Sequence, residues 1–242
     1  MKAIILAAGY ATRLYPLTEN FPKPLLPVGG KSILDWLIDD LKDSIDEFIV
    51  VTNHKFADIF REWAERLCTE GTGAIRIIDD GTMTNDTRLG AVRDIQLAAE
   101  GLDGDVLVMA GDNVLTFSLV PFLHYAKDKK TSCVMCHEEE NIEALRKTAV
   151  ITVDDDDIIT SYEEKPAEPL GHLAVPPFYI YRAEDLRRIP EALNSGCSAD
   201  APGSFAAWLS RQTPMHAWKM TGRRHDIGDM KSYEEVRESY HV

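Results

Sequence analysis

Positively charged and small side chains gather in the first thirty residues in a pattern that suits anion binding. An apolar run ends in four residues whose backbone N–H groups could approach a phosphate, namely Leu6, Ala7, Ala8 and Gly9. Arg13 and Lys23 follow and add fixed positive charge near those amides. The segment contains neither G-x-x-x-x-G-K-[ST] nor G-x-G-x-x-G, so it predicts a phosphate site of another kind.

A second polar loop contains Asp79, Asp80 and Gly81, which follow an apolar run at 74–78. One interpretation is that the two carboxylates only cap the end of a strand. The other is that one of them accepts a hydrogen bond from a bound ligand. The residues alone leave both interpretations open.

A third loop contains Gly111-Asp112-Asn113 directly after an apolar run at 105–110. An aspartate at the carboxyl end of a parallel strand lies at the edge where open α/β sheets bind their ligands. Asp112 is therefore a candidate site residue.

These loops need a sheet that brings strand ends to one edge. Apolar runs rich in β-branched residues predict buried strands at 2–8, 47–52, 74–78 and 105–110. Amphipathic patterns between them predict a helix with Ser32 as its N-cap and another helix at 56–68. The alternation predicts an α/β fold with a Rossmann-like mixed, mostly parallel sheet flanked by helices.

The second half of the chain predicts a small β-rich part. Its expected elements are strands at 132–137, 148–153, 158–163 and 216–220 and helices at 183–193 and 231–240. Asp154 to Asp157 form an acidic hairpin turn that we expect to be solvated. Cys133 and Cys136 are three apart on a strand and point to opposite faces, so two buried thiols are expected rather than a zinc site.

Composition excludes several classes of partner. The formal net charge of −14 over 242 residues argues against nucleic acid and anionic membranes. No stretch approaches the ~20 apolar residues that cross a bilayer, and no signal peptide precedes the first strand. Four cysteines fit a reducing compartment. We expect a cytoplasmic protein.

The opening segment resembles the sugar-phosphate nucleotidyltransferase family, typified by glucose-1-phosphate thymidylyltransferases. The family pattern L-A-x-G-x-G-T-R-L-x-P-L-T, followed by P-K-P-L-L-P, matches residues 6–18 and 22–27, with Ala11 in place of the second glycine. The resemblance implies the nucleotide-diphospho-sugar transferase fold in a single domain. Residues 1–130 would form its nucleotide-binding half and residues 131–242 its acceptor-binding half.

The resemblance also implies roles for particular residues. Asp112 in G-D-N and Asp226 in D-I-G would bind a metal, which the oxygen ligands predict to be Mg²⁺. In Glu163-Glu164-Lys165-Pro166, Glu164 would hold acceptor hydroxyls and Lys165 the acceptor's phosphate. Arg224 replaces a family aromatic residue and would contact an anionic acceptor or simply lie on the surface.

Together these features predict metal-assisted attack of an anionic acceptor on a nucleotide α-phosphorus. Arg13 would stabilise the leaving pyrophosphate, and Lys23 and Lys165 the charge around the α-phosphate and acceptor.

The resemblance implies that the loop at Asp79, Asp80 and Gly81 is the base loop, which reads a thymine or uracil base in the family. The family's glutamine is absent from it, so one of the two carboxylates could accept a hydrogen bond from the 4-amino group of cytosine, which thymine lacks. Pro176-Pro177 stiffen the acceptor wall. The preferred hypothesis is therefore a cytidylyltransferase that uses a pyrimidine triphosphate, CTP, and 2-aminoethylphosphonate.

Two alternatives remain open. The first is a sugar-1-phosphate nucleotidyltransferase that uses dTTP or UTP with a hexose 1-phosphate. The second is an inactive nucleotide-sensing subunit of the same fold. A homodimer is the expected assembly.

Overall fold

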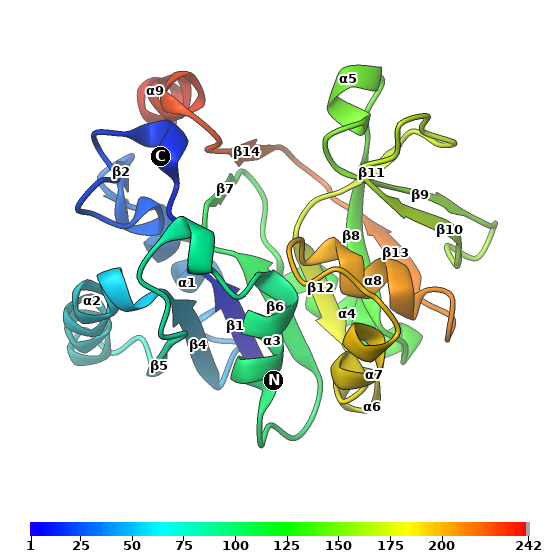
Figure 1. Ribbon diagram of the computed structural model, residues 1–242, viewed down its shortest axis with the longest axis horizontal. Helices are drawn as coiled ribbons and strands as arrows, with labels where there is room; N and C mark the ends of the chain where they lie inside the picture. The colour runs from blue at the N-terminus through cyan, green and yellow to red at the C-terminus, as the bar shows by residue number, and fades with distance from the viewer. Residues whose placement is uncertain (241–242) are drawn as a thin grey trace. The chain divides into compact units, whose positions relative to one another are not determined.

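The computed structural model describes residues 1–240, which form two compact units that interleave along the sequence (Figure 1). Unit 1 comprises Met1–Leu89, Ala110–Val120 and the segment that begins at Gly222. Unit 2 comprises Gly90–Met109 and Pro121–Thr221. Within the described residues, no helix combines the length and the apolar character needed to span a membrane.

Unit 1 contains a parallel sheet in the order β1-β4-β5. Its strands are β1 (Lys2–Leu6), β4 (Glu47–Thr52) and β5 (Ala74–Asp79). The register pairs Ile4 with Ile49, and both side chains are fully buried. The runs that form β1 and β4 are apolar because both faces of these strands are covered. The predicted burial of the strand at 74–78 is wrong, because β5 lies at the edge of the sheet and none of its residues is buried. The sheet thus carries the loops after β1 and β5.

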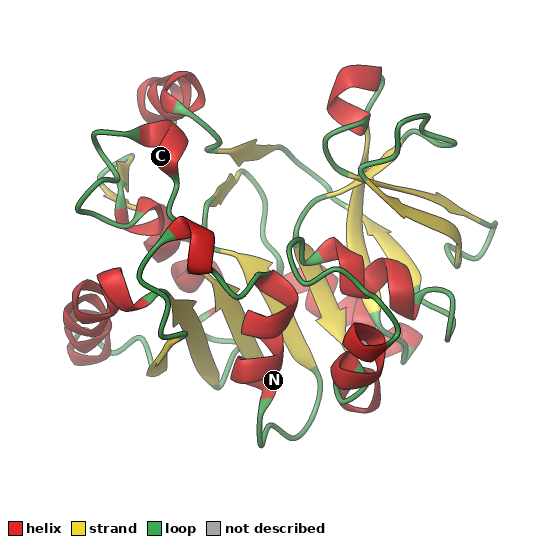
Figure 2. Cartoon of the chain, viewed as in Figure 1, coloured by secondary structure: helices red, strands yellow, loops and turns green. Residues whose placement is uncertain are grey.

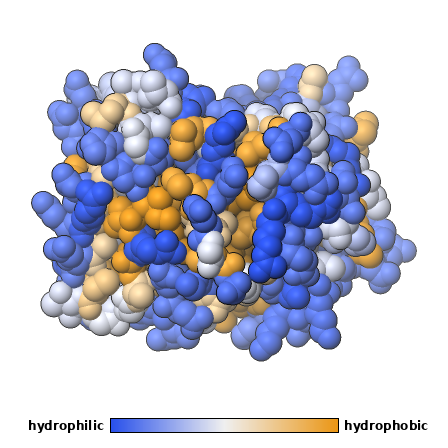
Figure 3. Space-filling view, turned by 60° about the horizontal axis from the view of Figure 1, so that its bottom comes forward, coloured by the Kyte–Doolittle hydropathy of each residue, from blue (hydrophilic) through white to orange (hydrophobic). Residues whose placement is uncertain are grey.

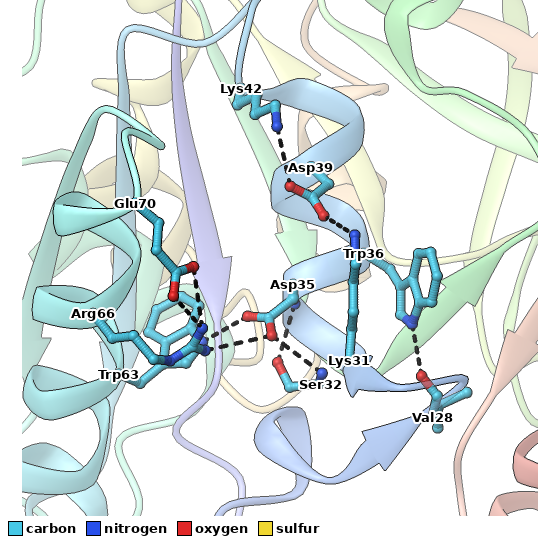
Figure 4. A network of polar contacts seen from close by, with 10 residues as sticks. All are labelled: Val28, Lys31, Ser32, Asp35, Trp36, Asp39, Lys42, Trp63, Arg66 and Glu70. Carbon is cyan, nitrogen blue, oxygen red and sulfur yellow. Dashed lines mark hydrogen bonds and ion pairs between the residues drawn. The ribbon is translucent and has the colours of Figure 1, made fainter. Parts of the chain in front are cut away.

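The helices of unit 1 are α1 (Ile33–Leu41), α2 (Ala57–Thr69) and α9 (Met230–Ser239). The predicted N-cap is confirmed, because the Ser32 hydroxyl accepts a hydrogen bond from the Asp35 backbone N–H at 3.1 Å and the Asp35 carboxylate accepts one from the Ser32 N–H (Figure 4). The same carboxylate accepts a hydrogen bond from the Trp63 indole at 2.8 Å. Asp35 therefore caps α1 and joins it to α2.

Two short antiparallel ladders complete unit 1. One joins β2 (Pro27–Val28) to β3 (Lys31–Ser32), and the other joins β7 (Asn113–Leu115) to β14 (Arg224–Asp226). The second ladder connects segments more than a hundred residues apart in the sequence.

Unit 2 contains a mixed sheet in the order β10-β9-β11-β8-β12-β6, with β13 parallel to β8 (Figure 2). Its strands are β6 (Val106–Ala110), β8 (Cys133–Glu138), β9 (Ala149–Val153), β10 (Ile159–Glu164), β11 (Leu173–Val175), β12 (Phe178–Tyr181) and β13 (His216–Lys219). Its helices are α3 (Ala91–Ala99), α4 (Val120–Lys129), α5 (Ile142–Leu145), α6 (Ala183–Leu186), α7 (Ile189–Asn194) and α8 (Gly203–Leu209). The predicted α/β class, a mixed sheet flanked by helices with a β-rich part, is confirmed.

The predicted single helix at 183–193 is wrong, because the segment forms the two helices α6 and α7. Pro190 lies in the first turn of α7. A proline inside a helix lacks the N–H donor and clashes with the carbonyl four residues earlier, whereas in a first turn it is tolerated. The chain therefore ends one helix and begins another.

Two smaller predictions are confirmed in unit 2. Cys133 and Cys136 are free thiols that are 0% and 2% exposed, and burial raises the pKa of Cys133 to about 11 and that of Cys136 to about 12. The acidic turn at 154–157 is exposed. Hydrophilic residues also cover most of the face drawn in Figure 3, in keeping with the charged composition.

Candidate active site

The loop after β1 is tethered to the end of β4. The Ala7 backbone N–H donates a hydrogen bond to the Val51 carbonyl at 2.8 Å. The Asn53 side chain, which is fully buried, donates one to the Ala8 carbonyl at 3.0 Å. Both alanines are buried. Leu6, Ala7 and Ala8 thus hold the loop in place at the carboxyl end of the sheet.

Gly9 differs from its neighbours because it is exposed. A Cβ added to it would meet no atom within 4 Å, and its backbone does not adopt a positive φ. Neither packing nor conformation therefore requires glycine here. The open space beside the Gly9 Cα allows an external group to approach the backbone closely.

We predict that Gly9→Ala leaves the melting temperature unchanged and lowers kcat/KM for the nucleotide by about 10²-fold, because an added methyl group displaces a phosphate from its reactive position. The measurement is steady-state kinetics beside thermal unfolding. A lower melting temperature, or unchanged kinetics, would show that the glycine does not serve ligand approach.

The backbone conformation of Ala11 explains why the family pattern has a glycine at this position. Its backbone has φ 45° and ψ 43°, the left-handed region that glycine adopts without strain. The conformation is held by hydrogen bonds that the Ala11 carbonyl accepts from the Leu14 N–H and the Thr18 hydroxyl, at 2.9 and 2.8 Å. The turn presents Arg13, which is exposed and forms no hydrogen bond or ion pair within residues 1–240.

Lys23 contacts the G-D-N loop. Its ammonium group forms an ion pair with Asp112 Oδ2 at 2.6 Å and donates a hydrogen bond to the Ile227 carbonyl. The Lys23 side chain is only 12% exposed. The structure therefore brings together Lys23, Asp112 and the segment that carries Asp226, as expected for one site.

The β7–β14 ladder sets the positions of the two candidate metal-binding aspartates. Asp226 pairs directly with Asn113, the residue after Asp112. The Asn113 amide donates a hydrogen bond to Asp112 Oδ1 at 2.8 Å, and Arg224 donates one to Asn113 Oδ1 at 2.6 Å. Arg224 also lies 3.6 Å from Asp226 Oδ2. Sequence reasoning missed Asn113 as a member of this cluster, although it stands within the G-D-N motif.

The electrostatics of Asp226 fit a cation site. Its pKa is raised because the surrounding protein removes water from the carboxylate and because Asp112 adds a like charge, although Arg224 and Lys23 oppose the shift. Half of the side chain, 52%, remains exposed. Two neighbouring carboxylates are a donor set that suits Mg²⁺, which takes one or two protein carboxylates and completes its shell with substrate phosphates and water.

No larger group of metal-ligating side chains gathers anywhere in residues 1–240. A metal at Asp112 and Asp226 would therefore depend on oxygen atoms from a bound nucleotide or from water.

In the base loop, Asp79 has both oxygens engaged. One accepts a hydrogen bond from the Gly81 N–H at 2.9 Å, and the other lies 2.6 Å from His54 Nδ1. Although burial opposes it, these contacts lower the pKa of Asp79. No sequence pattern pointed to His54.

Only one of the two Asp80 carboxylate oxygens has hydrogen-bond partners within residues 1–240. Its Oδ1 accepts hydrogen bonds from the Thr82 N–H and hydroxyl, both at 2.7 Å. Its Oδ2 is buried and has no hydrogen-bond partner within the described chain. Burial raises the pKa of Asp80, and the charge of Asp79 adds to the rise. Both aspartates thus cap the strand end, as one interpretation predicted. Asp80 Oδ2 remains available to accept a hydrogen bond.

Glu164 and Lys165 form a separate cluster in unit 2. Burial raises the pKa of Glu164, while Lys165 opposes the rise. A Cβ on Gly203 would lie 2.1 Å from Glu164 Oε2, so the glycine makes room for the carboxylate. Glu164 lines a pocket of about 470 Å³ together with Tyr162 and Arg211. Nothing in the sequence pattern pointed to Gly203.

Lys165 is exposed and adopts φ 50°, which is unusual for a residue other than glycine. Its N–H donates a hydrogen bond to the Thr148 carbonyl at 3.0 Å. Such left-handed conformations cost free energy and often mark functional positions. The turn after β10 therefore presents the Lys165 side chain at the surface of unit 2.

Comparisons with known proteins agree with the sequence resemblance. Residues 2–241 match a family model described as nucleotidyl transferase. The bifunctional protein GlmU of Methanocaldococcus jannaschii is 27% identical over 94% of this chain and 51% of its own length. A UTP–glucose-1-phosphate uridylyltransferase of Synechocystis is 27% identical over 96% of this chain and 61% of its own length.

The fold is shared with a solved structure of a UDP-glucose pyrophosphorylase complexed with UDP-glucose. That structure has a TM-score of 0.82 and 19% identity, and the match covers 99% of this chain and 97% of that chain. The chain thus spans about half of the length of the first relative and about three fifths of the length of the second. It spans nearly all of the solved chain.

Proposed function

Because the chain belongs to the nucleotidyl transferase family, we propose that it transfers a nucleotidyl group from a nucleoside triphosphate to a sugar 1-phosphate and releases pyrophosphate. The observation that carries the proposal is that a relative named for UTP and glucose 1-phosphate aligns with 96% of this chain. This support favours the sugar 1-phosphate over 2-aminoethylphosphonate, the acceptor preferred from the sequence.

In the proposed reaction, an oxygen of the acceptor's phosphate attacks the α-phosphorus in line, and the bond to the pyrophosphate oxygen breaks. The nucleophile is already an anion at neutral pH, so no general base is required. The protein aligns the reactants and neutralises their charge. Arg13 stabilises the departing pyrophosphate. Lys165 holds the acceptor's phosphate, and Glu164 its hydroxyl groups.

Lys23 has a dual role in this proposal. In the structure it pairs with Asp112 at 2.6 Å and keeps that carboxylate in a fixed orientation. With nucleotide bound, its ammonium group turns to the α-phosphate. Asp112 and Asp226 would hold Mg²⁺, which supplies positive charge for the phosphate oxygens when bound.

The experiment that tests the function is pyrophosphate release over a grid of CTP, UTP, dTTP, ATP and GTP with glucose 1-phosphate, mannose 1-phosphate and 2-aminoethylphosphonate. We expect the highest kcat/KM with a sugar 1-phosphate. A higher kcat/KM for 2-aminoethylphosphonate would instead support the cytidylyltransferase that acts on this phosphonate. Nucleotide binding without turnover of any pair would favour the nucleotide-sensing subunit.

A second prediction concerns the base, because Asp80 Oδ2 is buried and has no hydrogen-bond partner among residues 1–240. If it accepts a hydrogen bond from the cytosine amino group, CTP should be preferred over UTP by about 5- to 150-fold, which corresponds to 1–3 kcal/mol for a buried polar group left unpaired. Asp80→Asn should narrow this preference, because a rotated amide can donate to the uracil oxygen.

The matched control is Asp79→Asn, since both Asp79 oxygens already have partners. It should leave the ratio of kcat/KM for CTP and UTP close to that of the unmodified protein. Equal use of CTP and UTP by the unmodified protein, or a preference for dTTP, would contradict base reading by Asp80.

A further inference from the structure

Arg224 is mostly covered by the residues around Asp112 and Asp226. Only 17% of its side chain is exposed, and its guanidinium group donates a hydrogen bond to Asn113 Oδ1 at 2.6 Å. Asn113 is fully buried and donates to Asp112 Oδ1 at 2.8 Å. A continuous chain of contacts thus runs from Arg224 through the Asn113 amide to Asp112.

The β7–β14 register explains how the three side chains meet. Asp226 pairs with Asn113 and Arg224 pairs with Leu115. Side chains two apart on a strand share one face, so Asn113, Arg224 and Asp226 lie on the same face of this ladder. Neighbouring diagonal positions on one face are within reach of a long side chain.

The guanidinium group determines which end of the Asn113 amide faces Asp112. A guanidinium group can only donate hydrogen bonds, and a carboxylate can only accept them. The observed orientation satisfies both neighbours, because the amide oxygen faces Arg224 and the amide N–H faces Asp112. A rotated amide would set donor against donor and acceptor against acceptor.

We propose that Arg224 is a positioning residue that orients Asp112 through the Asn113 amide and does not bind the acceptor. The amide holds Asp112 Oδ1, so that Oδ2, which Lys23 contacts, is the oxygen presented to a metal ion. The inference rests on the proposed function for the role of Asp112 as a ligand of Mg²⁺. The orientation of the amide itself can be measured without any turnover.

The test compares Arg224→Met and Arg224→Lys, with Arg223→Met as the matched control because Arg223 is an exposed neighbour of the same charge. The first readout is NMR of the Asn113 side-chain amide in the protein without substrates, assigned by the loss of its signals in Asn113→Asp. The second readout is kinetic: the Mg²⁺ concentration for half-maximal rate, and KM for the acceptor.

We expect the Asn113 amide protons to exchange faster with solvent in Arg224→Met. The Mg²⁺ concentration for half-maximal rate should rise by about 10- to 100-fold, as for other residues that orient a metal ligand. KM for the acceptor should change little. Arg224→Lys keeps a donor at this position and should restore most of both readouts, and Arg223→Met should match the unmodified protein.

Other results would overturn the inference. A raised KM for the acceptor with an unchanged Mg²⁺ requirement would make Arg224 an acceptor-binding residue. Unchanged exchange of the Asn113 amide in Arg224→Met would refute the positioning role even if the unmodified protein turned over no substrate. If Arg224→Met does not fold, Arg224→Lys decides alone: an Mg²⁺ requirement and amide exchange near those of the unmodified protein support the role, and a raised acceptor KM refutes it.

Discussion

Asp112→Asn is expected to lower turnover by at least about 10³-fold while the chain stays folded, because the amide lacks the charge that would bind Mg²⁺ and balance Lys23. The amide oxygen can still accept a hydrogen bond from Lys23, which now lies 2.6 Å from Asp112. Losing the charge of this pair should cost about 1–3 kcal/mol of stability. Asp226→Asn should have a similar effect on turnover.

The measurement is pyrophosphate release as a function of Mg²⁺ concentration, with circular dichroism and thermal unfolding to verify the fold. Asp229→Asn is the matched control, because Asp229 lies three residues after Asp226 and caps α9, a role that asparagine fills equally well. Substantial Mg²⁺-dependent turnover by either Asp112→Asn or Asp226→Asn would exclude the two-carboxylate metal site.

Arg13→Ala should lower kcat by about 10²- to 10³-fold and leave KM for the nucleotide nearly unchanged. The guanidinium group is exposed and has no partner within residues 1–240, so the substitution removes no structural contact. Its contribution should appear mainly in the transition state, where charge develops on the leaving pyrophosphate. Stability should change little.

The kinetic comparison uses Arg187→Ala as its control, since Arg187 is 65% exposed and pairs with an exposed aspartate, Asp103. Such surface pairs contribute little, and the variant carries the same change of net charge. A rise in nucleotide KM at constant kcat would instead make Arg13 a ground-state binding residue.

Local patterns were sufficient for the parts of the fold that depend on neighbours in the chain. The strands at 47–52 and 74–78 and the Ser32 N-cap follow from runs of apolar residues and from one hydroxyl placed before a helix. The burial predicted for 74–78 did not follow, because β5 lies at the edge of the sheet. The burial of both strand thiols follows from the same local logic. The predicted single helix at 183–193 is wrong because helical periodicity does not include the constraint that Pro190 imposes.

The family pattern identified Lys23, Asp112 and Asp226, but it did not give their contacts. The pattern places residues in order along the chain, and it contains no information about which side chain meets which. Arg224 departs from the pattern, and its charge left open either a contact with an anionic acceptor or a surface position. The structure adds a hydrogen bond from Arg224 to Asn113 that neither alternative contained.

Only the tertiary structure decided the arrangement of this cluster. Asn113 and Arg224 are 111 residues apart, and they meet because β7 and β14 pair in one register. A shift of one residue would turn each side chain to the other face. In the same way, Asp79 and Asp80 are adjacent and chemically identical. The Gly81 N–H and His54 contact both oxygens of Asp79, whereas one oxygen of Asp80 has no hydrogen-bond partner in the described part of the chain. No local sequence pattern contains this difference.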